Sequence, residues 1–395
     1  MQRLFDLSKK EKKFVIGIMS GTSLDGVDVA LVEIDGNSIF TKINLIGFLE
    51  FPFPNGLKDK LLKNSIKESS NVEDISQLNF LIPNIYFDAI QVLCRSLNFP
   101  IEKIDLIGSH GQTIQHLPNK QNYFDYNISS TLQIGDPAVL AKLSGVITVG
   151  DFRTGDMALG GEGAPLVPYF DYILFHSHLK NRALLNIGGI SNFTILNKEK
   201  GLKDVFAFDV GPGNMLIDIV TKKLFDKAFD NDGNFARSGN FNYELFERLK
   251  LQDSFIERQP PKSTGREYYG ESFLSNLFKD FENLKSEDWL TTITKFTSYA
   301  IFRNYKKFIE EETKIDELIV SGGGAKNKFL YECLSKDFGQ EIEIKIIDDI
   351  GVSSDAKEAI CFAVLANETI SGNPTNIPRT TGAKHPTILG KICLP

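Results

Sequence analysis

The chain has 395 residues, of which 42% are hydrophobic and 24% are charged, and its formal net charge is −7. This length and composition allow a large buried core, so we expect two lobes. The acidic balance gives no electrostatic footprint for nucleic acid, because the basic cluster of Lys9, Lys10, Lys12 and Lys13 lies alone at the N-terminus and is typical of a solvated lead-in.

The apolar run after these lysines is interrupted by Gly17 and ends in polar residues. It therefore predicts neither a signal peptide nor a membrane span. The four cysteines are scattered without a C-x-x-C pair, which is typical of reduced, buried thiols. We expect a cytoplasmic protein without membrane contact.

Residues 14–33 combine two short apolar runs, which predict strands, with a polar turn at residues 20–26. The chain enters a second strand directly after Gly26, so neither a Walker loop nor a dinucleotide fingerprint fits. The glycine backbone, hydroxyls and carboxylate of this turn are the groups that could bind Mg-triphosphate. The same residue types are also common in ordinary hairpin turns. The stretch resembles the phosphate-binding hairpin of the sugar kinase, actin and chaperone ATPase superfamily.

Polar or glycine-rich segments follow several elements predicted along the chain, where an α/β sheet binds its ligands. The predicted elements are a strand at 45–51, a helix at 84–98, a strand at 104–108 ending in a loop at 109–113, and a helix and strand within 133–150 that lead to 151–153. Residues 160–163 are too rich in glycine for a helix and predict a loop.

The strongest internal signal is a weak repeat. Residues 183–196 again place a glycine-rich tip, Gly188 to Asn192, between two apolar strands. Two lobes that each open with such a hairpin imply a duplicated fold with nucleotide held between them.

Asp209 ends the predicted strand 205–210, and a helix follows at 215–225. A carboxylate at this point can be a general base, a metal ligand or merely a turn cap. Farther on, the pattern predicts a core helix at 289–311, a strand at 317–320, a glycine loop at 322–324, a helix from Lys328, a last helix within 351–367 and a tail that packs back on the first lobe.

Eight segments in order resemble the anhydro-N-acetylmuramic acid kinase family over nearly the whole chain. They are GIMSGTSLDGVD, SHGQT, DFR, GGEGAPLVP, NIGGISN, FDVGPGN, KSTGRE and SGGGAKN. Glu162 departs from the GGQGAP form expected for the fourth segment, and the sequence leaves the role of KSTGRE open. The resemblance implies a two-lobed, actin-like (ribonuclease H-like) α/β fold with an interdomain nucleotide cleft. We place the first lobe at 1–150 plus 372–395 and the second at 151–371.

The resemblance also implies site residues and ligands. Asp209 would be the catalytic base, and ATP, Mg²⁺ and an anhydro amino sugar would bind, with Asp25 reaching the metal through water. ATP would contact Gly21, Thr22, Ser23, Leu24, Asp25, Gly26, Val27, Asp28, Gly188, Gly189, Gly322, Gly323 and Gly324. The sugar would contact His110, Gln112, Thr113, Asp151, Arg153 and Glu358, with Arg153 facing the lactyl carboxylate.

Two other functions stay open at this point. One is a kinase of the same fold that acts on another sugar or a carboxylate. The other is a non-enzymatic ATP-driven switch, for which the SHGQT, DFR and GGEGAP segments would be unexplained. A homodimer is also left open.

Overall fold

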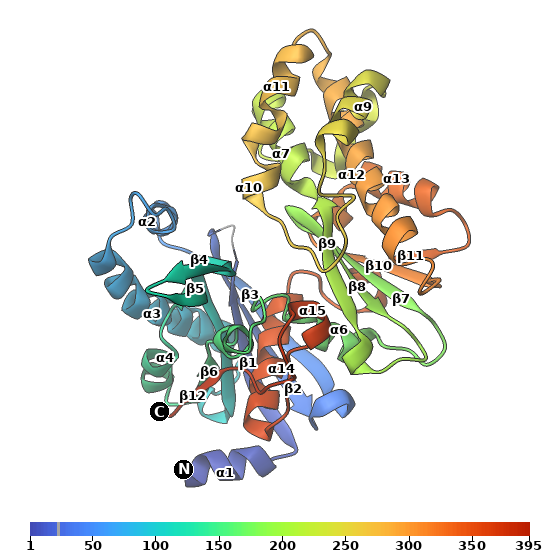
Figure 1. Cartoon of the computed structure of the whole chain (residues 1–395). Helices are drawn as coiled ribbons and strands as arrows, with labels where there is room; N and C mark the ends of the chain where they lie inside the picture. Colours follow the sequence, from blue (N-terminus) through green and yellow to red (C-terminus); the bar gives the residue numbers. More distant parts are fainter. Residues whose placement is uncertain (22–23) are drawn as a thin grey trace. The chain divides into compact units, whose positions relative to one another are not determined.

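The computed structural model describes residues 1–21 and 24–395 and divides into two compact units. Unit 1 holds Met1–Leu174 and Asp355–Pro395, and unit 2 holds Phe175–Ser354 (Figure 1). The sequence placed the boundaries at 150 and 371 instead. The observed division therefore puts DFR, the GGEGAP loop and the helix that carries Glu358 in unit 1, and it places the C-terminal tail there as expected.

Unit 1 is built on a sheet with the strand order β12-β6-β4-β1-β2-β3, to which β5 adds by pairing with β4. Strands β1, β2 and β3 form an antiparallel meander. Strand β4 runs parallel to β1, and β6 runs parallel to β4. The strands are β1 Lys12–Ser20, β2 Gly26–Asp35, β3 Lys42–Pro52, β4 Leu106–Tyr123, β5 Tyr126–Ile134, β6 Ile147–Gly150 and β12 Lys391–Cys393.

Unit 2 repeats this topology. Its sheet has the order β11-β10-β7-β8-β9, with an antiparallel meander of three strands followed by two strands parallel to the first. The strands are β7 Arg182–Ile187, β8 Ile190–Leu196, β9 Phe206–Pro212, β10 Glu317–Ser321 and β11 Glu343–Ile346. The predicted α/β duplication is therefore confirmed by two sheets with the same strand order, each opening with a hairpin.

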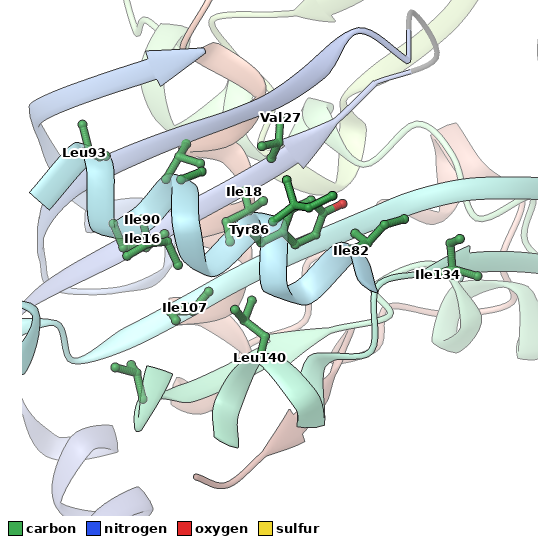
Figure 2. Packing of buried hydrophobic residues seen from close by; sticks show 14 of the residues in the cluster. Ile16, Ile18, Val27, Ile82, Tyr86, Ile90, Leu93, Ile107, Ile134 and Leu140 are labelled. Carbon is green, nitrogen blue, oxygen red and sulfur yellow. The ribbon is translucent and has the colours of Figure 1, made fainter. Parts of the chain in front are cut away.

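Two long helices cover opposite faces of the unit 1 sheet. Side chains of α3 pack on β1, β2 and β4 (Figure 2), and α14 packs on the other face so closely that a Cβ on Gly17 would lie 1.8 Å from the carbonyl oxygen of Ala359. A Cβ on Gly108 would likewise lie 2.0 Å from the carbonyl oxygen of Phe362, so both strands need glycine there. The helices of unit 1 are α1 Gln2–Lys9, α2 Leu57–Asn64, α3 Val72–Ser96, α4 Pro137–Ser144, α5 Thr154–Ala158, α6 Val167–Phe175 (which reaches the boundary), α14 Lys357–Ser371 and α15 Pro378–Thr381.

The apolar stripe predicted for the long helix of unit 2 is buried, because α12 packs both on the sheet and on a separate helical core. The helices are α7 Asn214–Phe225, α8 Asn234–Ser238, α9 Tyr243–Gln252, α10 Arg266–Tyr269, α11 Glu271–Asp280, α12 Ser286–Phe308 and α13 Lys328–Phe338. No helix in the part of the chain that the structure describes is long and apolar enough to cross a membrane.

Several local predictions were wrong. SHGQT is not a loop after a strand, because β4 continues through it to Tyr123 and pairs with β5. Asp209 does not end its strand, since β9 extends to Pro212. The N-terminal lysine cluster is only partly a solvated lead-in: Lys9 ends α1 and Lys10 and Lys12 are exposed, but Lys13 lies in β1 with only 2% of its surface exposed. All four cysteines are free thiols as expected, but Cys333 and Cys393 are only half-buried.

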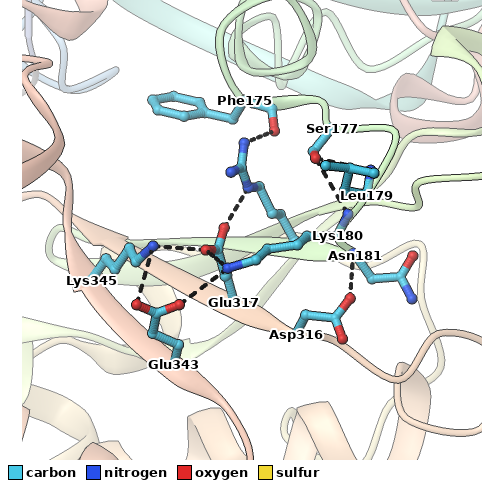
Figure 3. Close-up of polar contacts among 10 residues, drawn as sticks. Phe175, Ser177, Leu179, Lys180, Asn181, Asp316, Glu317, Glu343 and Lys345 are labelled. Atoms are coloured by element: carbon cyan, nitrogen blue, oxygen red, sulfur yellow. Dashed lines mark hydrogen bonds and ion pairs between the residues drawn. The ribbon is translucent and has the colours of Figure 1, made fainter.

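A buried carboxylate joins the amino ends of the three parallel strands of unit 2 (Figure 3). Glu317 is accompanied by the Nζ of Lys180 at 2.5 Å, the Nε of Arg182 at 2.6 Å and the Nζ of Lys345 at 2.7 Å. Burial alone would raise the pKa of Glu317, but the hydrogen bonds from these three cations outweigh burial and lower it to about 2. The network therefore holds together the amino ends of β7, β10 and β11, at the opposite end of β10 from the glycine loop.

Candidate active site

In unit 1, the tip of the β1–β2 hairpin is held by a side chain from β4. The hydroxyl of Ser20 donates to Oε1 of Gln112 at 2.5 Å, and Nε2 of Gln112 donates to the carbonyl oxygen of Gly21 at 3.4 Å. Gln112 is buried. This residue, which the resemblance assigned to the sugar, thus has partners in the predicted phosphate hairpin.

The predicted nucleotide residues at this tip differ in what they offer a ligand. Thr22 and Ser23 lie outside the described residues. Leu24 has a positive φ of 57°, and the side chain of Val27 lies in the core (Figure 2), so Val27 can reach a ligand only through its backbone. A Cβ on Gly26 would lie 2.6 Å from the carbonyl oxygen of Phe51, so this glycine is required by packing against β3.

Carboxylates gather beside the hairpin. Burial raises the pKa of Asp28 to about 7, and the negative charges of Glu50, Glu358, Asp25 and Asp355 raise it in the same direction. Such a concentration of carboxylate oxygen is the donor chemistry that a hard divalent cation prefers. The chemistry of these carboxylates suits a divalent cation, but among the residues that the structure describes no three His, Cys, Asp or Glu side chains form a direct metal site.

His110 and Arg153 form one hydrogen-bonded unit. The Nε of Arg153 donates to Nε2 of His110 at 3.0 Å, and its Nη1 donates to the carbonyl oxygen of Gly163 at 2.8 Å. Burial and the neighbouring guanidinium lower the pKa of His110 to about 3, so the imidazole is neutral and can accept this bond at Nε2. The other ring nitrogen, Nδ1, then donates to the carbonyl oxygen of Gly111 at 2.8 Å. His110 thereby orients Arg153.

Glu358 lies in the first turn of α14 with an exposed side chain. The protein around it removes part of its hydration and raises its pKa, while the positive charges of Lys357 and Arg153 oppose the rise. Arg153 and Glu358 therefore influence each other electrostatically.

The remaining predicted sugar contacts are engaged by other parts of unit 1. The carboxylate of Asp151 accepts from the hydroxyl of Thr154 and pairs with the ammonium of Lys391 on β12. The hydroxyl of Thr113 accepts from Nε2 of Gln133 at 3.2 Å. Both side chains thus have clear structural partners.

Sequence reasoning missed Asp156, which organises the GGEGAP loop. This fully buried carboxylate accepts from the backbone N–H of Gly163 at 2.8 Å, from Nδ2 of Asn376 at 2.7 Å and from the hydroxyl of Thr381 at 2.7 Å. A Cβ on Gly161 would lie 2.2 Å from Oδ2 of Asp156. The available signal was an acid three residues after DFR, but two of its partners, Asn376 and Thr381, lie more than 200 residues farther along the chain.

In unit 2, the tip of the second hairpin packs on the GPGN turn. The carbonyl oxygen of Gly188 accepts from the N–H of Asn214 at 2.8 Å, and that of Gly189 accepts from the N–H of Gly213 at 2.9 Å. A Cβ on Gly213 would lie 2.3 Å from the carbonyl oxygen of Gly188. Two predicted motifs, NIGGISN and FDVGPGN, therefore form one structure.

Asp209 lies beside them on β9 and is half-buried. Its Oδ2 accepts from the backbone N–H of Thr264 at 2.9 Å and from the hydroxyl of Ser263 at 3.1 Å. The KSTGRE segment, whose role the sequence left open, thus orients the carboxylate. These two bonds limit the orientations that the carboxylate can adopt.

The third motif of unit 2 joins the same edge of the sheet, because the loop 322–324 follows β10. Gly322 has a φ of +81°, and a Cβ there would lie 2.6 Å from Oδ1 of Asn186. A Cβ on Gly324 would lie 2.3 Å from Cγ2 of Ile187, whereas one on Gly323 would meet only Nδ2 of Asn214 at 3.4 Å. Gly323 is therefore the member of the loop with room above its backbone.

Comparison with solved structures gives distant likenesses only. An activator of the 2-hydroxyisocaproyl-CoA dehydratase from Clostridium difficile with bound ADPNP matches with a TM-score of 0.44 and 11% identity, covering 91% of this chain and 96% of that chain. A ROK family glucokinase from Streptomyces griseus in complex with glucose and AMPPNP matches with a TM-score of 0.40 and 10% identity, covering 90% and 99%.

Comparison of sequences is decisive. The family model for anhydro-N-acetylmuramic acid kinase matches residues 13–395. Among curated relatives, the anhydro-N-acetylmuramic acid kinase of Caldanaerobacter subterraneus subsp. tengcongensis is 45% identical over the full length of both chains. The enzyme of the same name from Bacillus cereus is 47% identical over 97% of this chain and 99% of the relative. The chain belongs to the anhydro-N-acetylmuramic acid kinase family.

Proposed function

We propose that this chain uses ATP and water to convert 1,6-anhydro-N-acetylmuramic acid into N-acetylmuramic acid 6-phosphate and ADP, with Asp209 as the base. Membership of the family gives the chain kinase activity on the anhydro sugar and a place in murein recycling. One observation supports the role of Asp209 as the base. Its carboxylate on β9 is oriented by two hydrogen-bond donors from residues 263–264.

The proposed chemistry couples two displacements. Asp209 takes a proton from water, and the water oxygen attacks the anomeric carbon while the bond from that carbon to the bridging 6-oxygen breaks. The 6-oxygen leaves with the electron pair and attacks the γ-phosphorus of ATP, from which ADP departs. Every atom of water thus remains accounted for, since its oxygen and one hydrogen stay on the anomeric carbon as a hydroxyl and its other hydrogen goes to Asp209 as a proton.

Phosphate binding is assigned to the first hairpin because its glycine-rich tip can offer backbone N–H groups to an anion, while the carboxylates of Asp25 and Asp28 would need a cation between them and the phosphates. Within residues 1–21 and 24–395, no three His, Cys, Asp or Glu side chains gather as a direct metal site. We therefore assign Asp25 to a water-mediated contact with Mg²⁺. When bound, the ion would offset negative charge on the phosphates.

Each unit by itself offers candidate contacts for the other ligand groups. On unit 1, the guanidinium of Arg153 can bind the lactyl carboxylate of the sugar, and His110 and Glu358 lie beside it in the same electrostatic group. On unit 2, the loop 322–324 is assigned to adenosine, because Gly323 exposes its backbone to a flat ligand. We also propose that the protein is cytoplasmic. Size-exclusion chromatography with light scattering would test whether it is a homodimer.

The role of Asp209 is tested by isotope labelling together with Asp209→Asn. In ¹⁸O-labelled water, the label should appear on the anomeric carbon and not in the phosphate, as tandem mass spectrometry of the early product can show. Asp209→Asn should lower turnover by about 10²- to 10⁴-fold because an amide cannot accept the proton, while the affinities for ATP and sugar persist. Label in the phosphate, or a phosphorylated product with a closed anhydro ring, would contradict the coupled mechanism.

A further inference from the structure

Residues 262–264 are attached to Asp209 through three hydrogen bonds, all within unit 2. Besides the two bonds to its carboxylate, the backbone N–H of Asp209 donates to the carbonyl oxygen of Lys262 at 3.1 Å. The side chains of the segment are the hydroxyls of Ser263 and Thr264 and the long ammonium side chain of Lys262. The segment carries no apolar side chain that could pack it in place, so its position must depend on another anchor.

The anchor is the side chain of Lys262, which is 9% exposed. Its Nζ donates to the carbonyl oxygens of Phe255 and Ile256 at 3.1 and 3.0 Å. It also lies 4.8 and 5.0 Å from the ring centroids of Phe255 and Phe308, and 5.9 Å from that of Phe208, which directly precedes Asp209 on β9. A buried ammonium is tolerated only with such compensation, so its partners restrict it to one position.

The two accepting carbonyls are themselves fixed by Asp253. Its Oδ1 accepts from the N–H groups of Phe255 and Ile256 at 2.9 and 3.3 Å, and its Oδ2 accepts from the hydroxyl of Tyr269 at 2.8 Å. Burial lowers the pKa of Lys262 to about 8, while the charge of Asp253 opposes the fall, so the ammonium persists at neutral pH. A continuous set of bonds thus runs from the Asp253 turn through Lys262 to Asp209.

We propose that Lys262 is a positioning residue for the reaction: it anchors residues 262–264 to the Asp253 turn, and this segment holds the carboxylate of Asp209 in its productive orientation. The proposal rests on the proposed function only for the reaction that Asp209 serves. The anchoring itself is a property of unit 2 and can be measured without substrate.

The test compares Lys262→Met with Lys307→Met in the full-length protein. Methionine keeps most of the aliphatic length of lysine but donates no hydrogen bond. Lys307 is the control, because its Nζ donates to the next carbonyl oxygen, that of Glu257, at 3.0 Å, pairs with the Glu257 carboxylate at 2.7 Å and lies 5.0 Å from the Phe308 ring, so its hydrogen bonds go to Glu257 and not to residues 262–264. Lys262→Gln, which retains an N–H donor, serves as the conservative variant and as a substitute if the methionine variant does not fold.

Two readouts separate positioning from general destabilisation. In the protein without substrate, hydrogen exchange of a peptide covering 262–268 should be faster by roughly tenfold or more in Lys262→Met and unchanged in Lys307→Met. With anhydro sugar and ATP, kcat should fall by roughly 10- to 100-fold with KM values nearly unchanged, and Lys262→Gln should recover part of it.

Unchanged exchange at 262–268, or a loss of kcat no larger than that of Lys307→Met at equal thermal stability, would overturn the proposal. If the unsubstituted protein did not turn over the anhydro sugar, the proposed function would be refuted instead. The hydrogen-exchange measurement would then still test whether Lys262 anchors residues 262–264.

Discussion

Replacement of Arg153 by alanine should weaken binding of the anhydromuramic sugar selectively. A bidentate bond between a guanidinium and a carboxylate contributes about 1.5 to 3 kcal/mol, which corresponds to roughly a 10- to 160-fold rise in KM for the sugar. Arg153 is only half-buried and already uses Nε and Nη1 toward His110 and Gly163. The remaining face of the fork is what a ligand carboxylate would meet, so we expect an effect in the lower part of this range.

The same two protein contacts complicate the alanine variant. Removal of the guanidinium leaves Nε2 of His110 and the carbonyl oxygen of Gly163 without their donor. The assay should therefore compare 1,6-anhydro-N-acetylmuramic acid with 1,6-anhydro-N-acetylglucosamine, which lacks the lactyl carboxylate. Local rearrangement affects both sugars alike, whereas loss of the carboxylate partner affects only the first. Arg153→Lys, which keeps the charge but loses the planar fork, should give an intermediate KM.

An equal rise in KM for both sugars would show that Arg153 acts only by supporting the loop around Gly163. A rise in the KM for ATP of the same size would point to a wider structural role. Because the pKa of His110 lies at about 3, the effect should also be independent of pH between about 5 and 8 as far as this imidazole is concerned.

Two further predictions concern unit 2. Gly323→Val should weaken ATP binding by at least about tenfold while the protein stays folded, since a Cβ there meets only one atom at 3.4 Å; calorimetric titration with unchanged ATP affinity would contradict the adenosine assignment. Glu317→Gln should lower the free energy of unfolding by about 3 kcal/mol at pH 7, because three cations lose a buried partner. The folded-state pKa of about 2 lies below the ordinary value of 4.5, so this stabilisation is complete above about pH 4.5 and is lost as the pH falls toward 2. Urea unfolding should accordingly show the difference between the two proteins shrinking on acidification, and a constant difference would refute the assigned network.

The sequence by itself determined the features that local chemistry encodes. The hairpin at 14–33 and its repeat at 183–196 are recognisable because strand periodicity and turn glycines act over a few residues. The same holds for the glycine loop after β10, where the positive φ of Gly322 explains the residue type. Asp209 is recognisable from its motif, and the structure places it within β9, two residues before Gly211.

Only the tertiary structure decided how those motifs are held. Gln112 reaches the hairpin tip across 92 residues of sequence from Ser20, and Asp156 joins the GGEGAP loop to Thr381 across 225 residues. SHGQT is part of a strand and not a loop because β4 pairs with β5. Lys262 can act as an anchor because its ammonium group donates to the turn that Asp253 holds. Periodicity and turn chemistry report a residue's near neighbours, whereas the pairing of a buried polar group depends on which distant segment folds against it.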